Sequence, residues 1–273
     1  MPELPEVETT RRGLEPWVVR KTVRDLVVRQ RRLRQPIPLG LKRRLKGRRC
    51  LGITRRAKYL LFAFEGCKGS LMIHLGMSGS LQVVRPGTPL RKHDHVDLVL
   101  EDGRSLRYHD PRRFGLWLWA EAPEQDHALL RHLGPEPLSE GFTAEALFQS
   151  ARKRRTAVKN YLMDGRTVVG VGNIYAAESL FAAGIRPGRA AGRVTREAYR
   201  RLHQEVRRIL AEAIRQGGTT LQDFVGGDGE PGYFAQELWV YGREGEPCRR
   251  CKTPIKSKVI GQRASCFCPQ CQV

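Results

Sequence analysis

Four cysteines near the C-terminal end constrain the fold of this chain more than any other feature. They form two pairs, CRRC at Cys248 and Cys251 and CPQC at Cys268 and Cys271, with residues 252–267 between them. The surrounding residues 235–273 are rich in glycine and basic side chains and are too polar to bury a large core. Two pairs at this separation fit four thiolates around one tetrahedral Zn²⁺, and a site filled by four protein ligands is structural. We therefore expect a C-terminal finger held together by one zinc ion.

A redox function for these pairs is the alternative, but the sequence around them lacks the βαβ pattern of thioredoxin-like proteins. Cys266 is a fifth thiol, and its spacing from Cys268 makes it the worse ligand. Four thiolates on Zn²⁺ carry a net negative charge, which neighbouring cations more than offset: Arg249, Arg250, Lys252, Lys256, Lys258 and Arg263. We expect this finger to face phosphate groups.

The charge of the whole chain indicates a polyanionic partner. Its 273 residues carry 49 Lys plus Arg against 28 Asp plus Glu, a formal net charge of +21. No apolar run reaches the roughly 18 residues of a membrane-spanning helix, and no signal peptide is recognisable, so nucleic acid is favoured over a membrane. We expect a soluble monomer in the cytoplasm, associated with the nucleoid. The preference for arginine over lysine fits bidentate phosphate binding and equally fits a thermophilic source.

Length and hydrophobic pattern predict two domains. From about residue 22 to 120 the sequence alternates as strands do, and Asp102-Gly103 is a strong signal for a hairpin turn. The segment 133–142 has the proline, glycine and acid content of a linker. Beyond it the period becomes helical, most clearly before Gly217, where one face carries Leu202, Val206, Ile209, Leu210 and Ala213. A β half therefore precedes a helical half and the finger.

The opening stretch MPELPEVETT places Pro2 and Glu3 just ahead of a predicted helix, because Pro5 suits a first helical turn and acids crowd the start. Aminopeptidases usually remove an initiator Met that precedes proline. Removal leaves the secondary amine of Pro2 as a candidate nucleophile. Most terminal prolines do no chemistry, so this stretch alone leaves catalysis open.

Three further stretches are candidates for contacts with nucleic acid. In VVGVGNIYAAESLF, Gly170 and Gly172 precede a helical pattern, so backbone amides and Asn173 are placed to meet a phosphate, although such glycines also serve simple packing. HLGMSG and YHDPRRFG each place an apolar residue in an expected loop after a strand: Met77 in the first, and Phe114 near Arg112 in the second. Apolar wedges beside arginines unstack bases, but the residues alone favour a loop-anchoring core role for Met77 and Phe114.

Taken together, these stretches resemble the bacterial formamidopyrimidine-DNA glycosylases. The motifs that carry the resemblance run in order along nearly the whole chain: PELPEVE, RRAKYLL, HLGMSG, DPRRFG, VVGVGNIYAAESLF, GGTTLQDF, DGEPGYFAQELWVYGR and the paired cysteines. The resemblance implies an α+β fold with an N-terminal β-sandwich and flanking helices, a helix-two-turn-helix domain, and a zinc finger built from a β-hairpin. We expect a catalytic domain over 1–132, a linker over 133–142, a DNA-binding domain over 143–234 and the finger over 235–273.

Members of this family remove 8-oxoguanine and ring-opened purines from DNA. The resemblance therefore implies a bifunctional DNA glycosylase and AP lyase of base excision repair, which binds damaged double-stranded DNA in a cleft between its domains. It makes Pro2 the nucleophile, Glu3 its partner acid and Lys58 a lysine near the lesion. The nearest alternative is a sister enzyme for oxidised pyrimidines, which the PELPE start disfavours. A DNA-binding protein without catalytic activity is the other.

The same resemblance implies a set of DNA contacts. Met77, Arg112 and Phe114 are similar to residues that fill the gap left by an extruded nucleotide, with Arg112 facing the orphaned base. The expected phosphate or basic contacts are His74, Lys159, Asn173 and Arg263. Residues 225–233 resemble a loop that closes over the everted base. The sequence departs from the usual family pattern at four positions: Ala57, Arg186, Gly227 and Cys266.

Overall fold

The computed structural model describes residues 2–217 and 238–273. They fall into two compact units, one within residues 2–131 and the other formed by residues 132–216 and 238–273. The expected fold class, a β-sandwich with flanking helices followed by a helical unit and a β-hairpin finger, is confirmed. The finer division into a linker at 133–142 and a separate finger from residue 235 stays a prediction.

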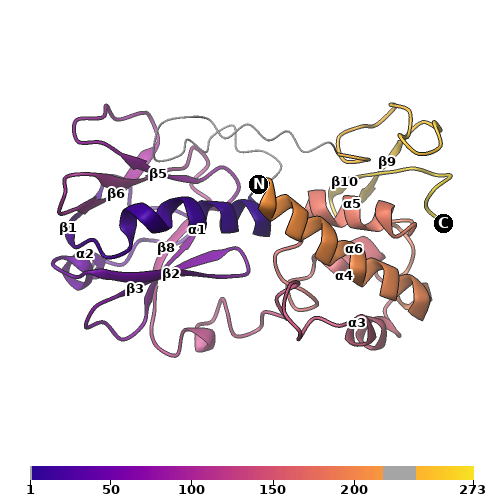
Figure 1. Ribbon diagram of the computed structural model, residues 1–273, viewed down its shortest axis with the longest axis horizontal. Helices are drawn as coiled ribbons and strands as arrows, with labels where there is room; N and C mark the ends of the chain where they lie inside the picture. Colours follow the sequence, from indigo (N-terminus) through magenta and orange to yellow (C-terminus); the bar gives the residue numbers. More distant parts are fainter. Residues whose placement is uncertain (1, 218–237) are drawn as a thin grey trace. The chain divides into compact units, whose positions relative to one another are not determined.

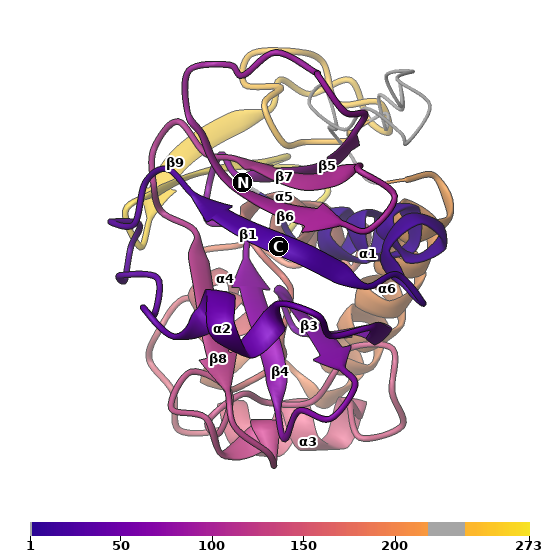
Figure 2. The same cartoon turned by 90° about the vertical axis from the view of Figure 1, so that its left-hand side faces the viewer.

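The first unit contains two antiparallel sheets of four strands. One sheet has the order β1-β6-β7-β5, with β1 Val23–Val28, β6 Asp94–Leu100, β7 Ser105–His109 and β5 Ser80–Val84. The other has the order β2-β3-β4-β8, with β2 Cys50–Arg56, β3 Tyr59–Phe64, β4 Ser70–His74 and β8 Leu116–Ala120. Figure 2 shows the strands of the two sheets crossing each other, and the inward side chains form one core that includes Phe62, Ile73, Leu98, Tyr108 and Trp117.

The alternation read from the sequence explains this sandwich. In β3, every second residue is buried, because successive side chains of a strand point to opposite faces. The predicted hairpin joins β6 to β7, and Gly103 has a φ of 84°, in the left-handed region that a tight turn needs. Helix α1, Leu4–Val18, covers the open side where the edge strands β2 and β5 lie, and α2, Leu41–Leu45, packs on β1 (Figure 1). A short 3₁₀ turn, η1, spans Glu124–Asp126.

The second unit is helical and ends in a β-hairpin. Its elements are α3 Ala144–Ala151, α4 Val158–Met163, α5 Asn173–Ala182, the 3₁₀ turn η2 Ala191–Arg193, α6 Arg196–Arg215, β9 Lys256–Ile260 and β10 Arg263–Phe267. Thr195 caps α6 by accepting the Ala198 N–H. The predicted face of α6 is buried, with Leu202, Val206 and Leu210 inaccessible to solvent. The β9–β10 hairpin packs on α5, so this helix is the platform of the finger.

Among the described residues, no helix is both long enough and apolar enough to cross a membrane.

Candidate reaction site and nucleic-acid interface

The head of α1 holds the two residues at the start of the chain. Glu3 is the N-cap of this helix, and its N–H donates to the Glu6 carboxylate at 2.8 Å in a capping box. Pro5 stands in the first turn, as expected from its fixed φ. Glu3 is only 1 % exposed, whereas Pro2 is half-buried. The carboxyl group of Glu3, the residue that follows Pro2 in the chain, is therefore buried, and the capping box fixes its place.

Glu8 ties α1 to the turn that carries Lys58. Its carboxylate accepts from Arg55 at 3.2 Å, and Arg55 in turn donates to the Ala57 carbonyl at 2.9 Å. Arg11 and Arg12 also bind Glu8, at 3.0 and 2.9 Å. Burial raises the pKa of Glu8, but hydrogen bonds from these arginines outweigh it, and the pKa stays below its ordinary value. A charged carboxylate thus bridges the helix and the β2–β3 turn.

Ala57, one of the four departures from the family pattern, lies at a position whose backbone conformation favours glycine. Its φ of 53° lies in the left-handed region, where a Cβ atom is unfavourable and glycine is favoured. The turn retains this conformation with alanine, and the Arg55 contact to the Ala57 carbonyl supports it. Lys58 follows at the corner of the hairpin.

His74 ends β4 and is held as a neutral ring. Its Nδ1 accepts from the Gly76 N–H at 2.9 Å, so in the neutral ring the hydrogen is on Nε2. Burial, reinforced by the charges of Lys58 and Arg34, lowers the pKa of His74 to about 4. Near neutral pH this side chain offers a phosphate one N–H donor and no charge.

The pH dependence of stability tests this assignment. As pH falls from about 6.5 to about 4, His74 takes up a proton in the unfolded chain but not in the folded one, so the free energy of unfolding decreases. We expect His74→Asn, whose Oδ1 can replace Nδ1 as the acceptor for Gly76, to show a flatter decrease over this window. Urea unfolding at intervals from pH 7 to 4 measures it. Equal slopes for both proteins would show that the pKa of His74 is not lowered.

Two neighbouring loops carry the three expected gap-filling residues. Met77 follows β4 and is half-buried, whereas Arg112 and Phe114 follow β7 and are exposed. The Arg112 guanidinium lies 4.8 Å from the centre of the Phe114 ring, in a cation–π contact. Phe114 is 43 % exposed, so the alternative that it is a core anchor is wrong.

The expected phosphate contacts of the second unit gather where α5 meets the finger. Gly172 caps α5 and Asn173 is its first residue, confirming the predicted helix start. The Asn173 amide donates to the Ala264 carbonyl at 3.3 Å, next to Arg263, whose side chain is exposed on β10. The N-terminus of α5 and the Asn173 amide are thus brought next to the β10 backbone beside Arg263, from positions far apart in the sequence.

Lys159 does not fit its expected part as a direct DNA contact. It is fully buried, and its ammonium donates to Asn173 Oδ1 at 2.6 Å, Ser265 Oγ at 2.7 Å and the Ala264 carbonyl at 3.2 Å. A lysine ammonium has three donors, and these acceptors can use all of them. From its buried position on α4, Lys159 therefore links this helix to α5 through Asn173 and to β10 through Ala264 and Ser265.

We expect Lys159→Met to weaken DNA binding about tenfold through the loss of this support, and to reduce the free energy of unfolding by about 1–3 kcal/mol. The mutation keeps the length of the side chain but removes the donor for Asn173 Oδ1. Fluorescence anisotropy and urea unfolding measure the two effects, with the exposed Lys153→Met as the matched control. If Lys159→Met weakens binding as much in an Asn173→Ala background as in the wild type, its effect does not pass through Asn173.

The four cysteines of the two pairs converge in the second unit. Their Sγ atoms all lie within 4.8 Å of one another, with 4.0 Å between Cys248 and Cys271 and 3.4 Å between Cys251 and Cys268. Four sulfurs about 2.3 Å from a tetrahedral Zn²⁺ would be about 3.8 Å apart. The geometry therefore fits one structural zinc ion. Cys266 is outside this set and packs into the apolar cluster beneath the finger.

Several buried carboxylates escaped the sequence analysis, and three of them lie within recognised motifs and hold neighbouring segments: Glu8, Asp110 and Glu178. Glu178 on α5 accepts the backbone N–H groups of Trp239, Val240 and Tyr241 at 2.9 to 3.0 Å and so anchors the chain that leads into the finger. The sequence carries one signal that could have indicated these three residues: each is an acid within a recognised motif of a strongly basic chain.

A β-sandwich with flanking helices, a helical unit and a finger with four converging cysteines together define a protein of the helix-two-turn-helix and zinc-finger class that binds nucleic acid. Family models agree: the formamidopyrimidine-DNA glycosylase N-terminal domain matches residues 1–117, the H2TH domain of the same enzymes matches 133–225, and a zinc finger found in FPG and IleRS matches 245–273. The chain belongs to the formamidopyrimidine-DNA glycosylase family.

Individual relatives match over the whole length. The formamidopyrimidine-DNA glycosylases of Thioalkalivibrio sulfidiphilus and Pseudomonas aeruginosa are 58% and 57% identical over 272 residues, which is 100% of each chain. The crystal structure of MutM (FPG) from Thermus thermophilus superposes with a TM-score of 0.86 at 42% identity, covering 99% of this chain and 98% of that one. Lactococcus lactis FPG bound to DNA containing Fapy-dG gives 0.90 at 34% identity, covering 99% of each chain.

Proposed function

We propose that this protein excises 8-oxoguanine and formamidopyrimidines from damaged duplex DNA and then cleaves the strand, as a bifunctional DNA glycosylase and AP lyase. The observation that carries the proposal is the start of α1, where the buried carboxyl group of Glu3 directly follows Pro2 in the chain. Relatives support the substrate class: the Lactococcus lactis protein has been solved with Fapy-dG DNA and with DNA containing an abasic site, and a MutM with carbocyclic 8-oxo-G DNA.

Pro2 is the proposed nucleophile, after removal of Met1. An α-amino group has a pKa of about 7.7–8.0, so part of it is neutral near pH 7, whereas a lysine at about 10.4 is almost wholly charged. The Pro2 nitrogen attacks C1′ of the deoxyribose, the bond from C1′ to the damaged base breaks, and the base leaves with a proton. Opening of the sugar ring then gives an iminium. Because the amine is secondary, this iminium is permanently charged and withdraws electrons from C2′.

Glu3 is the proposed proton carrier. In its protonated form it can give a proton to the sugar ring oxygen as the C1′–O4′ bond breaks. As a carboxylate it can then accept a proton during elimination, first with loss of the 3′ phosphate and then of the 5′ phosphate. The capping box holds Glu3 beside Pro2 throughout. Lys58, on the turn that Glu8 and Arg55 support, is the proposed lysine near the lesion.

The remaining residues have proposed roles in DNA binding. His74, Asn173 and Arg263 bind phosphates, and Lys159 supports Asn173 from within. Met77, Arg112 and Phe114 fill the gap left by the everted nucleotide, with Arg112 facing the orphaned base. The loop at residues 225–233, expected to close over that nucleotide, lies outside the described residues. Cys248, Cys251, Cys268 and Cys271 hold Zn²⁺, which keeps the hairpin folded and takes no part in the reaction.

Borohydride trapping on matched duplexes tests the proposal. An 8-oxoguanine duplex is expected to give strand scission and, with borohydride, a covalent protein–DNA adduct, whereas a thymine-glycol duplex reacts more slowly. Faster cleavage of thymine glycol would assign the protein to the pyrimidine-specific branch. Tight binding of damaged DNA without scission or adduct would leave a DNA-binding protein. Intact-mass measurement of the same preparation establishes whether Met1 has been removed.

A further inference from the structure

One buried carboxylate joins the two loops that carry Met77, Arg112 and Phe114. Asp110 is fully buried at the end of β7. Its Oδ1 accepts from the Ser78 hydroxyl at 2.8 Å, and its Oδ2 accepts from the Tyr108 hydroxyl at 2.9 Å and the Gly115 N–H at 2.9 Å. These three donors come from the 75–79 loop, from β7 and from the end of the 110–115 loop. Asp110 is therefore the common acceptor of both loops.

Glycines make room for this arrangement. A Cβ atom on Gly115 would lie 1.7 Å from the Tyr108 hydroxyl, and one on Gly79 would lie 2.7 Å from it. Gly76, at a φ of 70°, brings the first loop against the second, since its Cβ atom would lie 2.5 Å from the Phe114 carbonyl carbon. The two loops thus meet backbone to backbone, with the Tyr108 hydroxyl enclosed between them.

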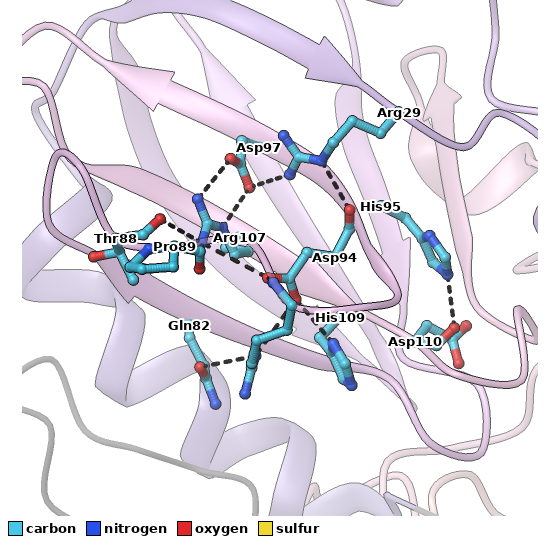
Figure 3. Close-up of polar contacts among 11 residues, drawn as sticks. Arg29, Gln82, Thr88, Pro89, Asp94, His95, Asp97, Arg107, His109 and Asp110 are labelled. Atoms are coloured by element: carbon cyan, nitrogen blue, oxygen red, sulfur yellow. Dashed lines mark hydrogen bonds and ion pairs between the residues drawn. The ribbon is translucent and has the colours of Figure 1, made fainter.

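The donors to Asp110 keep their protons. Burial, with a further contribution from the Asp110 charge, raises the pKa of Tyr108 far above its ordinary value, so the phenol stays protonated and donates. The Asp110 main-chain carbonyl accepts from His95 Nε2 at 2.8 Å, and burial lowers the pKa of His95, which keeps that ring neutral. Figure 3 shows His95 reaching Asp110, and it also shows the ion pair that joins Arg107 to Asp97 at 3.0 Å.

Ser78 links the first loop to this carboxylate through its side chain, and it is the neighbour of Met77. Its oxygen also accepts from the Arg112 N–H at 3.3 Å. The serine hydroxyl therefore contacts both loops, with Met77 on one side and the Arg112 backbone on the other.

We propose that Asp110 is a positioning residue for base eversion, and that it acts through Ser78 to hold Met77 in register with Arg112 and Phe114. This inference rests on the proposed function, because it assumes that these three residues enter the DNA. Three hydrogen bonds to the buried Asp110 carboxylate fix both loops before DNA binds. Met77, Arg112 and Phe114 therefore need not be ordered at the moment of eversion.

Ser78→Ala is the sharpest test, because Asp110→Ala would leave Tyr108 and Gly115 without an acceptor in the core and endanger folding. The alanine variant removes the side-chain link that the Ser78 hydroxyl makes between the loops and leaves the other two bonds to Asp110 in place. We expect a single-turnover excision rate on an 8-oxoguanine duplex about tenfold lower, the effect of one hydrogen bond to a charged group. Ser139→Ala, which removes an exposed hydroxyl bonded to the Glu136 carbonyl, is the matched control.

A double-mutant cycle with Met77→Ala separates positioning from a general loss of stability. If Ser78 acts through Met77, Ser78→Ala lowers the rate in the wild type but has little further effect in the Met77→Ala background. Equal effects in both backgrounds, or no effect in either, would overturn the positioning role and leave the proposed function intact. If Met77→Ala itself excises at the wild-type rate, the wedge assignment fails and this inference with it.

Discussion

Pro2→Gly is expected to lower the excision rate on an 8-oxoguanine duplex at least about a hundredfold, and borohydride trapping with it. Glycine at position 2 also permits removal of Met1, so the variant still presents a free α-amine at the head of α1. That amine is primary, and its imine with C1′ must take up a proton before it withdraws electrons as the proline iminium does. Glycine also lacks the ring that restricts the orientation of the nitrogen.

Pro86→Gly, in an exposed loop of the same unit, is the matched control and is expected to react at the wild-type rate. Protein that retains Met1 should be inactive, since the Pro2 nitrogen is then part of a peptide bond. Trapping is measured by the shift of labelled DNA on a denaturing gel, beside an intact mass for each variant. An unchanged rate and an unchanged adduct yield for Pro2→Gly would show that another residue attacks C1′.

Loss of one zinc ligand should have the second large effect. Cys268 is fully buried, and Cys268→Ser replaces a thiolate by a poor ligand of similar shape. Structural zinc supplies folding free energy to small domains, with binding free energies of about 10–16 kcal/mol in zinc-finger peptides. We expect the zinc content to fall from one ion per chain to nearly none, and the DNA dissociation constant to rise at least about a hundredfold. Arg263 and two of the three acceptors of Lys159, Ala264 and Ser265, belong to the hairpin that would be released.

Cys266→Ser is the informative control, because Cys266 lies on the same hairpin but outside the cluster of four sulfurs. It should keep one zinc ion per chain and near-normal affinity. Metal analysis and fluorescence anisotropy on the purified variants measure both quantities. Full affinity in a zinc-free Cys268→Ser protein would show that the finger does not support DNA binding.

Local patterns predicted the elements because each depends on neighbours in the sequence. The hairpin at Asp102-Gly103, the start of α5 at Asn173 and the buried face of α6 follow from turn chemistry, capping and helical period. The zinc ligands could be predicted because the spacing of cysteine pairs is itself local. The roles of Pro2 and Glu3 came from the family resemblance, since a proline and an acid at a terminus have no distinctive chemistry by themselves.

Burial and long-range partners could not be predicted in this way. In the sequence, Lys159 is not distinguished from the other cations of this basic chain. In the structure it is buried and bonded to Ser265, 106 residues away. Whether a charged side chain faces solvent or the interior depends on which acceptors the fold brings to it, and these are remote in the sequence. Phe114 shows the reverse case, as a large apolar residue that the fold leaves exposed.

The sequence by itself determined the class of fold, the order of its elements, the zinc ligands and the family, because periodicity, spacing and motif order are properties of the chain. Only the tertiary structure decided which polar groups are structural supports. Asp110, Glu8 and Glu178 are acids whose partners come from separate strands, helices and loops. A buried charge is stable only where several donors converge on it, and that convergence exists only once the chain has folded.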